Sequence, residues 1–194
     1  MADAKFCASW NLAPTDPAPI VRYDAKAGSR AFDVMRWGLI PYWAKDIKIG
    51  FSTINARAEE VDTKPAFREA FQRRRCLVPL DNFYEWKKTA TGKQPYAIAL
   101  KDRRLMGMAG LWETWRSPAG ERIRSFTIIT TQPNELCAEL HNRMPAVLST
   151  MRVDCGQLDP DAVIQGKRGV IAVDLKLDKF SDLAVGELVR DPSL

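Results

Sequence analysis

Histidine is almost absent from this chain, because His141 is the only one among 194 residues. A zinc site that needs two or more imidazoles is therefore excluded. The four cysteines, Cys7, Cys76, Cys137 and Cys155, lie far apart and contain no CxxC pair. This spacing predicts reduced thiols, with neither a metal site nor a disulfide framework.

Long apolar runs are also missing. None approaches the ~20 residues that a membrane span needs, and the first ten residues, MADAKFCASW, lack the basic and apolar regions of a signal peptide. We therefore expect a cytoplasmic protein without a membrane partner. The content of 46% hydrophobic and 27% charged residues suits a single domain with a sizeable core.

Aromatic residues are scarce in the C-terminal part, where only Phe180 lies beyond Phe126. The net charge of 29 − 24 = +5 is also unevenly spread. Residues Lys64–Arg104 contain eleven basic and four acidic side chains, whereas Val153–Leu194 contain five basic and eight acidic ones. A basic stretch beside aromatic residues is typical of a nucleic-acid surface, and a solvated basic face is the plainer alternative.

The hydrophobic pattern predicts an α+β fold with a mostly antiparallel sheet and a few short helices. The predicted strands are Ala31–Gly38, Cys76–Lys87, Pro95–Leu100, Leu105–Trp115 and Ile123–Thr131. The turn segments TATGKQ and SPAGE divide these runs into consecutive hairpins. Helices are predicted within residues 63–75, where Thr63 can cap, and within residues 131–140, so that His141 leaves a helix end.

Two further segments contain residues that could support chemistry. In NFYEWKK, Glu85 lies among aromatic residues on a predicted strand, and it is either desolvated with a raised pKa or paired with Lys87 or Lys88. In STINARAEE, Asn55 and Arg57 share a face if the segment is extended, so that an amide lies beside a guanidinium suited to phosphate.

Seven motifs occur in order along the chain: NLAP (11–14), RWGLIPYW (36–43), INAR (54–57), CLVPLDNFYEW (76–86), MAGLWE (108–113), FTIITTQPN (126–134) and HNRMPAVL (141–148). The aromatic cluster in RWGLIPYW is by itself either core or a stacking platform. Together the motifs closely resemble the SOS response-associated peptidase (SRAP) family. The resemblance places the SRAP-like domain in residues 1–150, without its N-terminal segment, and leaves residues 151–194 as a divergent C-terminal part.

The resemblance implies a barrel-like, mostly antiparallel sheet with a basic groove and no cofactor. It also implies a monomer that acts on abasic sites in single-stranded DNA and is nucleoid-associated when on DNA. Family members attach to the ring-opened sugar through an N-terminal cysteine, exposed by self-removal of the initiator Met. That self-removal is the only cleavage which the family name implies here, because no Ser-His-Asp arrangement is evident.

The resemblance also assigns roles by motif position. Glu85 and His141 become acid/base groups for imine formation and its reversal, Asn55 orients the site and Arg57 holds phosphate. The remaining residues that line the pocket, stack on bases or support the DNA backbone are Asn11, Pro14, Trp43, Trp86, Thr130 and Arg143.

The sequence departs from the family pattern at both ends. The family's MCGR segment has no counterpart before Asn11, and Cys7 has no free amine unless the first six residues are removed. We therefore expect crosslinking to be lost or altered. Three hypotheses follow: an enzyme that uses the amine of Ala2 or Lys5, a non-covalent single-stranded DNA binding module, or a degenerate remnant that folds poorly.

Overall fold

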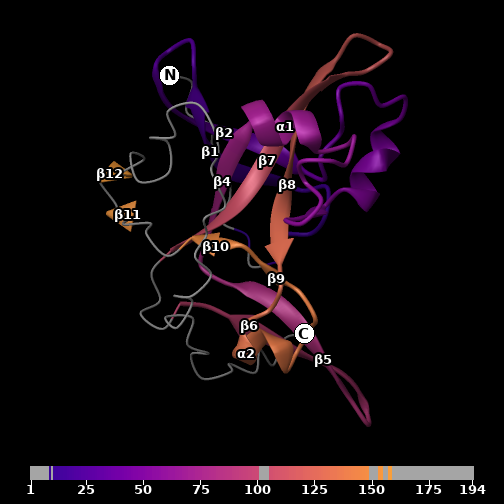
Figure 1. Ribbon diagram of the computed structural model, residues 1–194, viewed down its shortest axis with the longest axis vertical. Coiled ribbons are helices and arrows are strands. Elements are labelled where there is room, and N and C mark those ends of the chain that lie inside the picture. Colours follow the sequence, from indigo (N-terminus) through magenta and orange to yellow (C-terminus); the bar gives the residue numbers. More distant parts are fainter. Residues whose placement is uncertain (1–8, 10, 101–104, 149–152, 155–156, 159–194) are drawn as a thin grey trace. The chain divides into compact units, whose positions relative to one another are not determined.

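The computed structural model describes residues 9, 11–100, 105–148, 153–154 and 157–158. They form two compact units (Figure 1). The barrel unit comprises the described residues up to 79 together with residues 108–131. The hairpin unit comprises the described residues of 80–107 and those from 132 onward.

A closed sheet of five strands forms the barrel unit, in the order β7–β4–β1–β2–β8, with β7 pairing again with β8. The strands are β1 (Pro17–Asp24), β2 (Ser29–Trp37), β4 (Arg75–Leu80), β7 (Met106–Arg116) and β8 (Arg122–Thr131), and β3 (Asn55–Arg57) adds to β8. The pairs β1–β2, β1–β4 and β7–β8 are antiparallel, whereas β2–β8 and β3–β8 are parallel. This architecture confirms the predicted α+β class with a mostly antiparallel, barrel-like sheet.

The barrel interior is filled by large apolar side chains that are almost completely inaccessible to water. They are Ile20, Met35, Leu39, Ile40, Met108, Leu111 and Phe126, each at most 1% exposed. Burial of one such side chain stabilises the fold by about 1.5–3 kcal/mol. Gly110 permits close strand packing, because a Cβ atom there would lie 2.9 Å from the carbonyl oxygen of Thr127 and 3.0 Å from the Cys76 sulfur.

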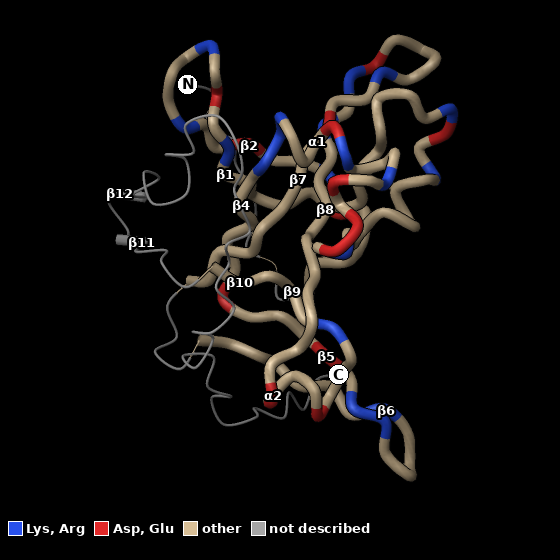
Figure 2. Tube along the Cα trace, in the orientation of Figure 1, with Lys and Arg blue, Asp and Glu red and all other residues tan. Residues whose placement is uncertain are grey.

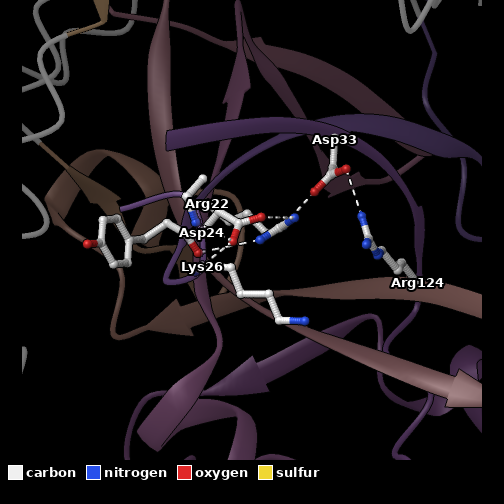
Figure 3. Close-up of polar contacts among 7 residues, drawn as sticks. Arg22, Asp24, Lys26, Asp33 and Arg124 are labelled. Atoms are coloured by element: carbon white, nitrogen blue, oxygen red, sulfur yellow. Dashed lines mark hydrogen bonds and ion pairs between the residues drawn. The ribbon is translucent and has the colours of Figure 1, made fainter. Parts of the chain in front are cut away.

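A buried arginine links three strands of the barrel (Figure 3). The Arg22 side chain, 8% exposed, donates through Nε to Asp33 and lies 3.4 Å from the Asp24 carboxylate. Asp33 also accepts from Arg124 at 2.8 Å, and the Arg22 guanidinium lies 4.9 Å from the centre of the Trp112 ring. Each buried charge therefore has a partner, which offsets its desolvation.

Two short helical elements occur in the barrel unit, the 3-10 helix η1 (Ile47–Ser52) and the helix α1 (Arg68–Arg73). The prediction that Thr63 caps a helix is wrong. Turns occupy residues 58–63 and 65–67, and Phe67 precedes the helix without a side-chain cap. The Thr63 hydroxyl donates to the Glu60 carbonyl at 3.3 Å. A local Ser/Thr turn competes here with helix initiation.

The hairpin unit contains the antiparallel pair β5 (Phe83–Thr89) and β6 (Gly92–Ile98), and the helix α2 (Glu135–Ala138). Its other strands are β9 (Met144–Pro145), β10 (Val147–Leu148), β11 (Val153–Asp154) and β12 (Gln157–Leu158). Its core consists of Ile98, Cys137 and Met144, against which Phe83, Leu100 and Leu140 pack. None of the helices in the described part of the chain could cross a membrane.

Both predicted hairpins are confirmed. The TATG turn places Thr89 opposite Gly92, which has a φ of +143°, and the SPAGE loop joins β7 to β8 with Gly120 at a φ of +87°. These backbone angles favour glycine because it has no Cβ atom. The predicted strand Cys76–Lys87 is in fact two strands, β4 and β5, separated by Asp81 and Asn82.

Candidate functional site

Glu85 lies in the middle of β5 in the hairpin unit. Because side chains alternate along a strand, it shares a face with Phe83, which packs against the buried cluster around Cys137. The Glu85 carboxyl group is half-buried, and desolvation raises its pKa above the ordinary value. Among the ion pairs within the described residues, none joins Glu85 to Lys87 or Lys88, so the structure favours the desolvated alternative.

His141 follows α2, and the local sequence determines where it lies. Asn134 caps the helix, because its Oδ1 accepts the backbone N–H of Cys137 at 2.9 Å. The backbone N–H groups of Leu140 and His141 donate to the carbonyl oxygen of Cys137 at 3.0 and 2.8 Å, which closes the final turn. The prediction that His141 leaves the end of a helix is therefore confirmed.

The exposed imidazole of His141 is held by the backbone two residues further on. Its Nδ1 atom accepts the backbone N–H of Arg143 at 3.1 Å and lies 3.2 Å from the Arg143 carbonyl oxygen. When Nδ1 carries a hydrogen, the carbonyl oxygen of Arg143 can accept it; when Nδ1 carries none, the backbone N–H of Arg143 can donate to it. The contacts with the Arg143 backbone therefore involve Nδ1 and not Nε2.

Glu85 and His141 interact electrostatically although 55 residues separate them along the chain. Burial raises the pKa of the Glu85 carboxyl group, and the nearby charge of His141 partly offsets this effect. A carboxyl group and an imidazole placed together can deliver one proton and remove another during a single reaction. The hairpin unit thus brings together the two predicted acid/base residues.

The two described cysteines are buried and free. Burial, assisted by the negative charge of Glu85, raises the pKa of the Cys137 thiol to about 11. Burial also raises the pKa of Cys76. Neither thiol is suited to act as a nucleophile near neutral pH, because the reactive species is the thiolate. Cys7 and Cys155 lie outside the described residues.

Asn55 and Arg57 lie on β3 in the barrel unit, and both are exposed on either side of the buried Ala56. β3 pairs in parallel with β8, with Arg57 opposite Thr130, and the backbone N–H of Ala58 donates to the Thr130 carbonyl at 2.8 Å. The segment is extended, which meets the condition set by the sequence spacing, so the amide and the guanidinium share a face.

The Arg57 side chain retains most of its contact with water, at 64% exposure, and lies 4.0 Å from the Glu60 carboxylate. An exposed ion pair at that distance contributes little to the free energy of folding. Arg57 could therefore exchange Glu60 for a phosphate with little loss of stability. Thr130 is buried, at 9% exposure, and its hydroxyl donates to the Ala56 carbonyl at 3.5 Å. This contact adds a side-chain hydrogen bond to the pairing of β8 with β3.

The aromatic cluster of the RWGLIPYW motif divides into two parts. Trp37 stacks on Phe126 with ring centroids 6.5 Å apart, and its Nε1 donates to the Ile54 carbonyl at 2.9 Å. Tyr42 and Trp43 instead expose 56% and 48% of their surface. Trp37 is therefore a packing residue, whereas the other two rings are accessible to a ligand.

A contact between two glycines supports the loops that hold these exposed rings. The Gly38 backbone, at a φ of +109°, approaches Gly50 so closely that a Cβ atom would lie 2.6 Å from the Gly50 carbonyl oxygen. The hydroxyl of Thr53 donates to the Leu39 carbonyl and further joins the two segments. Phe51, in η1, is 60% exposed, and no motif in the sequence had pointed to this accessible ring.

Asn11 and Pro14 are exposed residues next to the start of the barrel. The following residue, Thr15, adopts a φ of +82°, which is rare for a β-branched side chain. Its backbone N–H donates to the Trp37 carbonyl at 2.9 Å, and its carbonyl accepts from the Arg36 side chain at 3.1 Å. The residue that follows NLAP, together with the RWGLIPYW and INAR motifs, thus meets at Trp37.

The other two residues predicted to bind DNA, Trp86 and Arg143, belong to the hairpin unit. Trp86 is 50% exposed and lies on the face of β5 opposite to that of Glu85. Arg143 is half-buried, and its backbone holds the His141 ring. No group of three or more His, Cys, Asp or Glu side chains in the described part of the chain is arranged to bind a metal ion.

A closed, mostly antiparallel barrel with these motifs in this order agrees with the resemblance drawn from the sequence. The chain belongs to the family described as SOS response associated peptidase (SRAP), which matches residues 1–177.

Among related proteins, the abasic site processing protein YobE of Bacillus subtilis is 40% identical over 199 residues, covering 100% of this chain and 88% of YobE. YoqW of Bacillus subtilis, with the same description, is 43% identical over 150 residues, covering 77% of this chain and 66% of YoqW. HMCES of Rattus norvegicus, also called an abasic site processing protein, is 32% identical, covering 74% of this chain and 51% of HMCES. This chain thus spans half to two thirds of the latter two relatives.

Two solved structures share the fold. A protein from Bacteroides thetaiotaomicron matches with a TM-score of 0.65 and 35% identity, covering 70% of this chain and 60% of that protein. A protein from Bordetella bronchiseptica matches with a TM-score of 0.63 and 28% identity, covering 71% and 70% respectively.

Proposed function

We propose that this protein recognises abasic sites in single-stranded DNA and transfers protons in the reversible imine chemistry of the ring-opened sugar. The observation that supports this function best is the electrostatic interaction of Glu85 with His141 in the hairpin unit. The relatives described as abasic site processing proteins support the same substrate.

The chemistry moves two protons from nitrogen to oxygen. An amine nitrogen of the protein adds to the aldehyde carbon, so that a C–N bond forms while the carbonyl π bond breaks, the nitrogen loses one proton and the oxygen gains one to become a hydroxyl group. The hydroxyl then gains a second proton and leaves as water, and the nitrogen loses its second proton, so that amine and aldehyde give imine and water. Glu85, with its raised pKa, and His141 through Nε2 would supply and accept these protons in both directions.

The exposed residues of the barrel unit would bind the DNA strand. Arg57 would hold a phosphate and Asn55 would orient the sugar, since both lie on one face of β3. Trp43 would stack on a base, as would Trp86 of the hairpin unit. Asn11 and Pro14 would line the lesion pocket, Thr130 would support β3, and Arg143 would orient the His141 ring.

A second candidate is a binding module that grips the damaged strand without a covalent link. The burial of Cys76 and Cys137 favours it, because no described thiol is available for attack. In both hypotheses the protein is a cytoplasmic monomer that needs no cofactor and that associates with the nucleoid when it is bound to DNA.

Binding to three otherwise identical single strands tests the proposal. One strand carries a natural abasic site, one carries a tetrahydrofuran analogue that has no aldehyde, and one is intact. The proposal predicts tighter binding to both lesions than to the intact strand, measured by fluorescence anisotropy at fixed salt. Equal affinity for all three would overturn abasic-site recognition, whereas a preference for the natural site over the analogue would support the imine.

A further inference from the structure

One face of the β5–β6 hairpin combines an exposed aromatic ring with two lysines. Lys88 lies directly opposite Lys93, and Trp86 lies directly opposite Pro95. Residues two apart on a strand share a face, so these four side chains lie on the same side of the hairpin. Trp86, Lys88 and Lys93 are all exposed. We call these three residues the Trp86 face. Figure 2 colours the basic positions of the β5–β6 hairpin blue along the Cα trace.

The opposed lysines form a pair that the isolated hairpin does not favour. Residues directly opposite on antiparallel strands have Cβ atoms about 4.5–5.5 Å apart, and like charges at such positions destabilise the pairing. Among the ion pairs of the described residues, none involves Lys88 or Lys93. A polyanion bound on this face would offset the repulsion, because its negative charges would attract both lysines.

The Trp86 face is separate from the acid/base residues. Glu85 and Lys87 lie on the other side of β5, since they alternate with Trp86 and Lys88 along the strand. The positive charge of Lys88 and Lys93 is therefore not explained by a need to neutralise Glu85. Their position two residues beyond the exposed ring instead suits a strand whose base contacts Trp86 while its phosphates reach the lysines.

We propose that Lys88 and Lys93 form a phosphate clamp that holds the backbone of the DNA strand beside Trp86. This inference rests on the proposed function, because it takes the bound polyanion to be the damaged strand. The clamp binds phosphate and does not read the lesion, so it contributes equally to the affinity for abasic and intact strands.

The test measures the affinity for single-stranded DNA with a tetrahydrofuran site at several salt concentrations. Neutralising two phosphate contacts lowers the salt slope by about 0.7 for each contact on a single strand. We therefore expect the K88Q/K93Q variant to lower the slope by about 1.4 and to weaken binding to lesion and intact strands by the same factor. The K88R/K93R variant keeps both charges and should retain the wild-type slope.

The control variant, K26Q/R122Q, removes two charges from exposed positions in the barrel unit. It should leave the slope close to that of the wild type. An unchanged slope in K88Q/K93Q, or an equal decrease in the control, overturns the clamp while leaving abasic-site recognition intact. A wild-type protein that binds no single-stranded DNA overturns both proposals. Thermal unfolding of the variants serves as the folding control, because an unaltered transition excludes misfolding as the cause of weaker binding.

Discussion

The charge of His141 opposes the effect of burial on Glu85: burial raises the pKa of the carboxyl group, and the imidazole lowers it. Replacement of His141 by Gln should therefore raise the pKa of Glu85 further. The shift is measurable from the carboxyl carbon resonance of Glu85 during a pH titration. Asn142→Gln, at the exposed neighbouring position, should leave it unchanged, and a fall in the pKa of Glu85 in H141Q would refute the interaction.

The raised pKa of Glu85 also predicts how stability depends on pH. A carboxyl group whose pKa is higher in the folded than in the unfolded state favours folding below its unfolded pKa, and this contribution disappears as the pH rises through the folded value. The neutral variant E85Q should consequently unfold at a higher temperature than the wild type at pH 7–8. The difference should shrink as the pH falls through the raised pKa of Glu85, and the decrease should be complete below 4.5, the ordinary pKa of glutamate. A less stable E85Q at neutral pH would contradict this.

The Gly38–Gly50 contact should tolerate no side chain on Gly38. Gly38→Ala combines a φ of +109° with a Cβ atom 2.6 Å from the Gly50 carbonyl oxygen, so it should destabilise the protein by about 1–3 kcal/mol in urea denaturation. Gly28→Ala is a suitable control, because its φ of +62° is also positive but its Cβ would contact nothing within 4 Å. Equal losses in the two variants would show that backbone strain, and not the close contact, limits Gly38.

Loss of Asp33 should leave the buried Arg22 without its main partner. We expect Asp33→Ala to lower the free energy of unfolding by about 3 kcal/mol, since removing one member of a buried ion pair leaves an uncompensated charge. Arg124→Gln removes only the 43% exposed partner of Asp33 and should cost less than about 1 kcal/mol. Equal effects in urea denaturation would argue against a special role for the buried arginine.

Trp37 and Trp43 should behave differently although both belong to one motif. Trp37→Ala removes the stack on Phe126 and the hydrogen bond to Ile54, so it should cost about 3 kcal/mol of stability. Trp43→Ala removes a ring that is 48% exposed and should weaken single-stranded DNA binding while leaving the unfolding temperature almost unchanged. Unaltered binding by a folded W43A variant would remove this ring from the proposed DNA surface.

The sequence was informative where a single local pattern determines structure. Alternation predicted β2, β7 and β8, and turn residues placed both hairpins. β1 was missed because Pro17 and Pro19 obscure the pattern, although buried residues such as Ile20 fix it in the sheet. The parallel pairings of β8 with β2 and β3 were also missed, because they depend on chain closure and not on local sequence.

In the candidate site, too, the features set by local sequence were predictable and those set by tertiary packing were not. The residue pattern predicted that His141 follows a helix, and that Asn55 and Arg57 share a face if their segment is extended. The family resemblance assigned Glu85 and His141 to one reaction, but the residue pattern alone could not place them together, since their approach depends on the packing of Phe83 and Leu140 on the core around Cys137. The Asn134 cap was detectable, because a cap residue followed by Glu in the first turn is a recognised helix start.

Trapping with borohydride tests the central claim most directly. The protein is mixed with single-stranded DNA that carries one natural abasic site, with and without reductant, and the products are resolved on a denaturing gel beside the E85Q and H141Q variants. The account predicts a protein–DNA band that requires reductant, because reduction turns the reversible imine into a stable amine, and that is weaker in both variants. The absence of a band from a wild-type protein that still binds the strand would contradict the imine. A band in both variants as strong as that of the wild type would contradict the roles of Glu85 and His141. A stable band without reductant would contradict the reversibility of the imine.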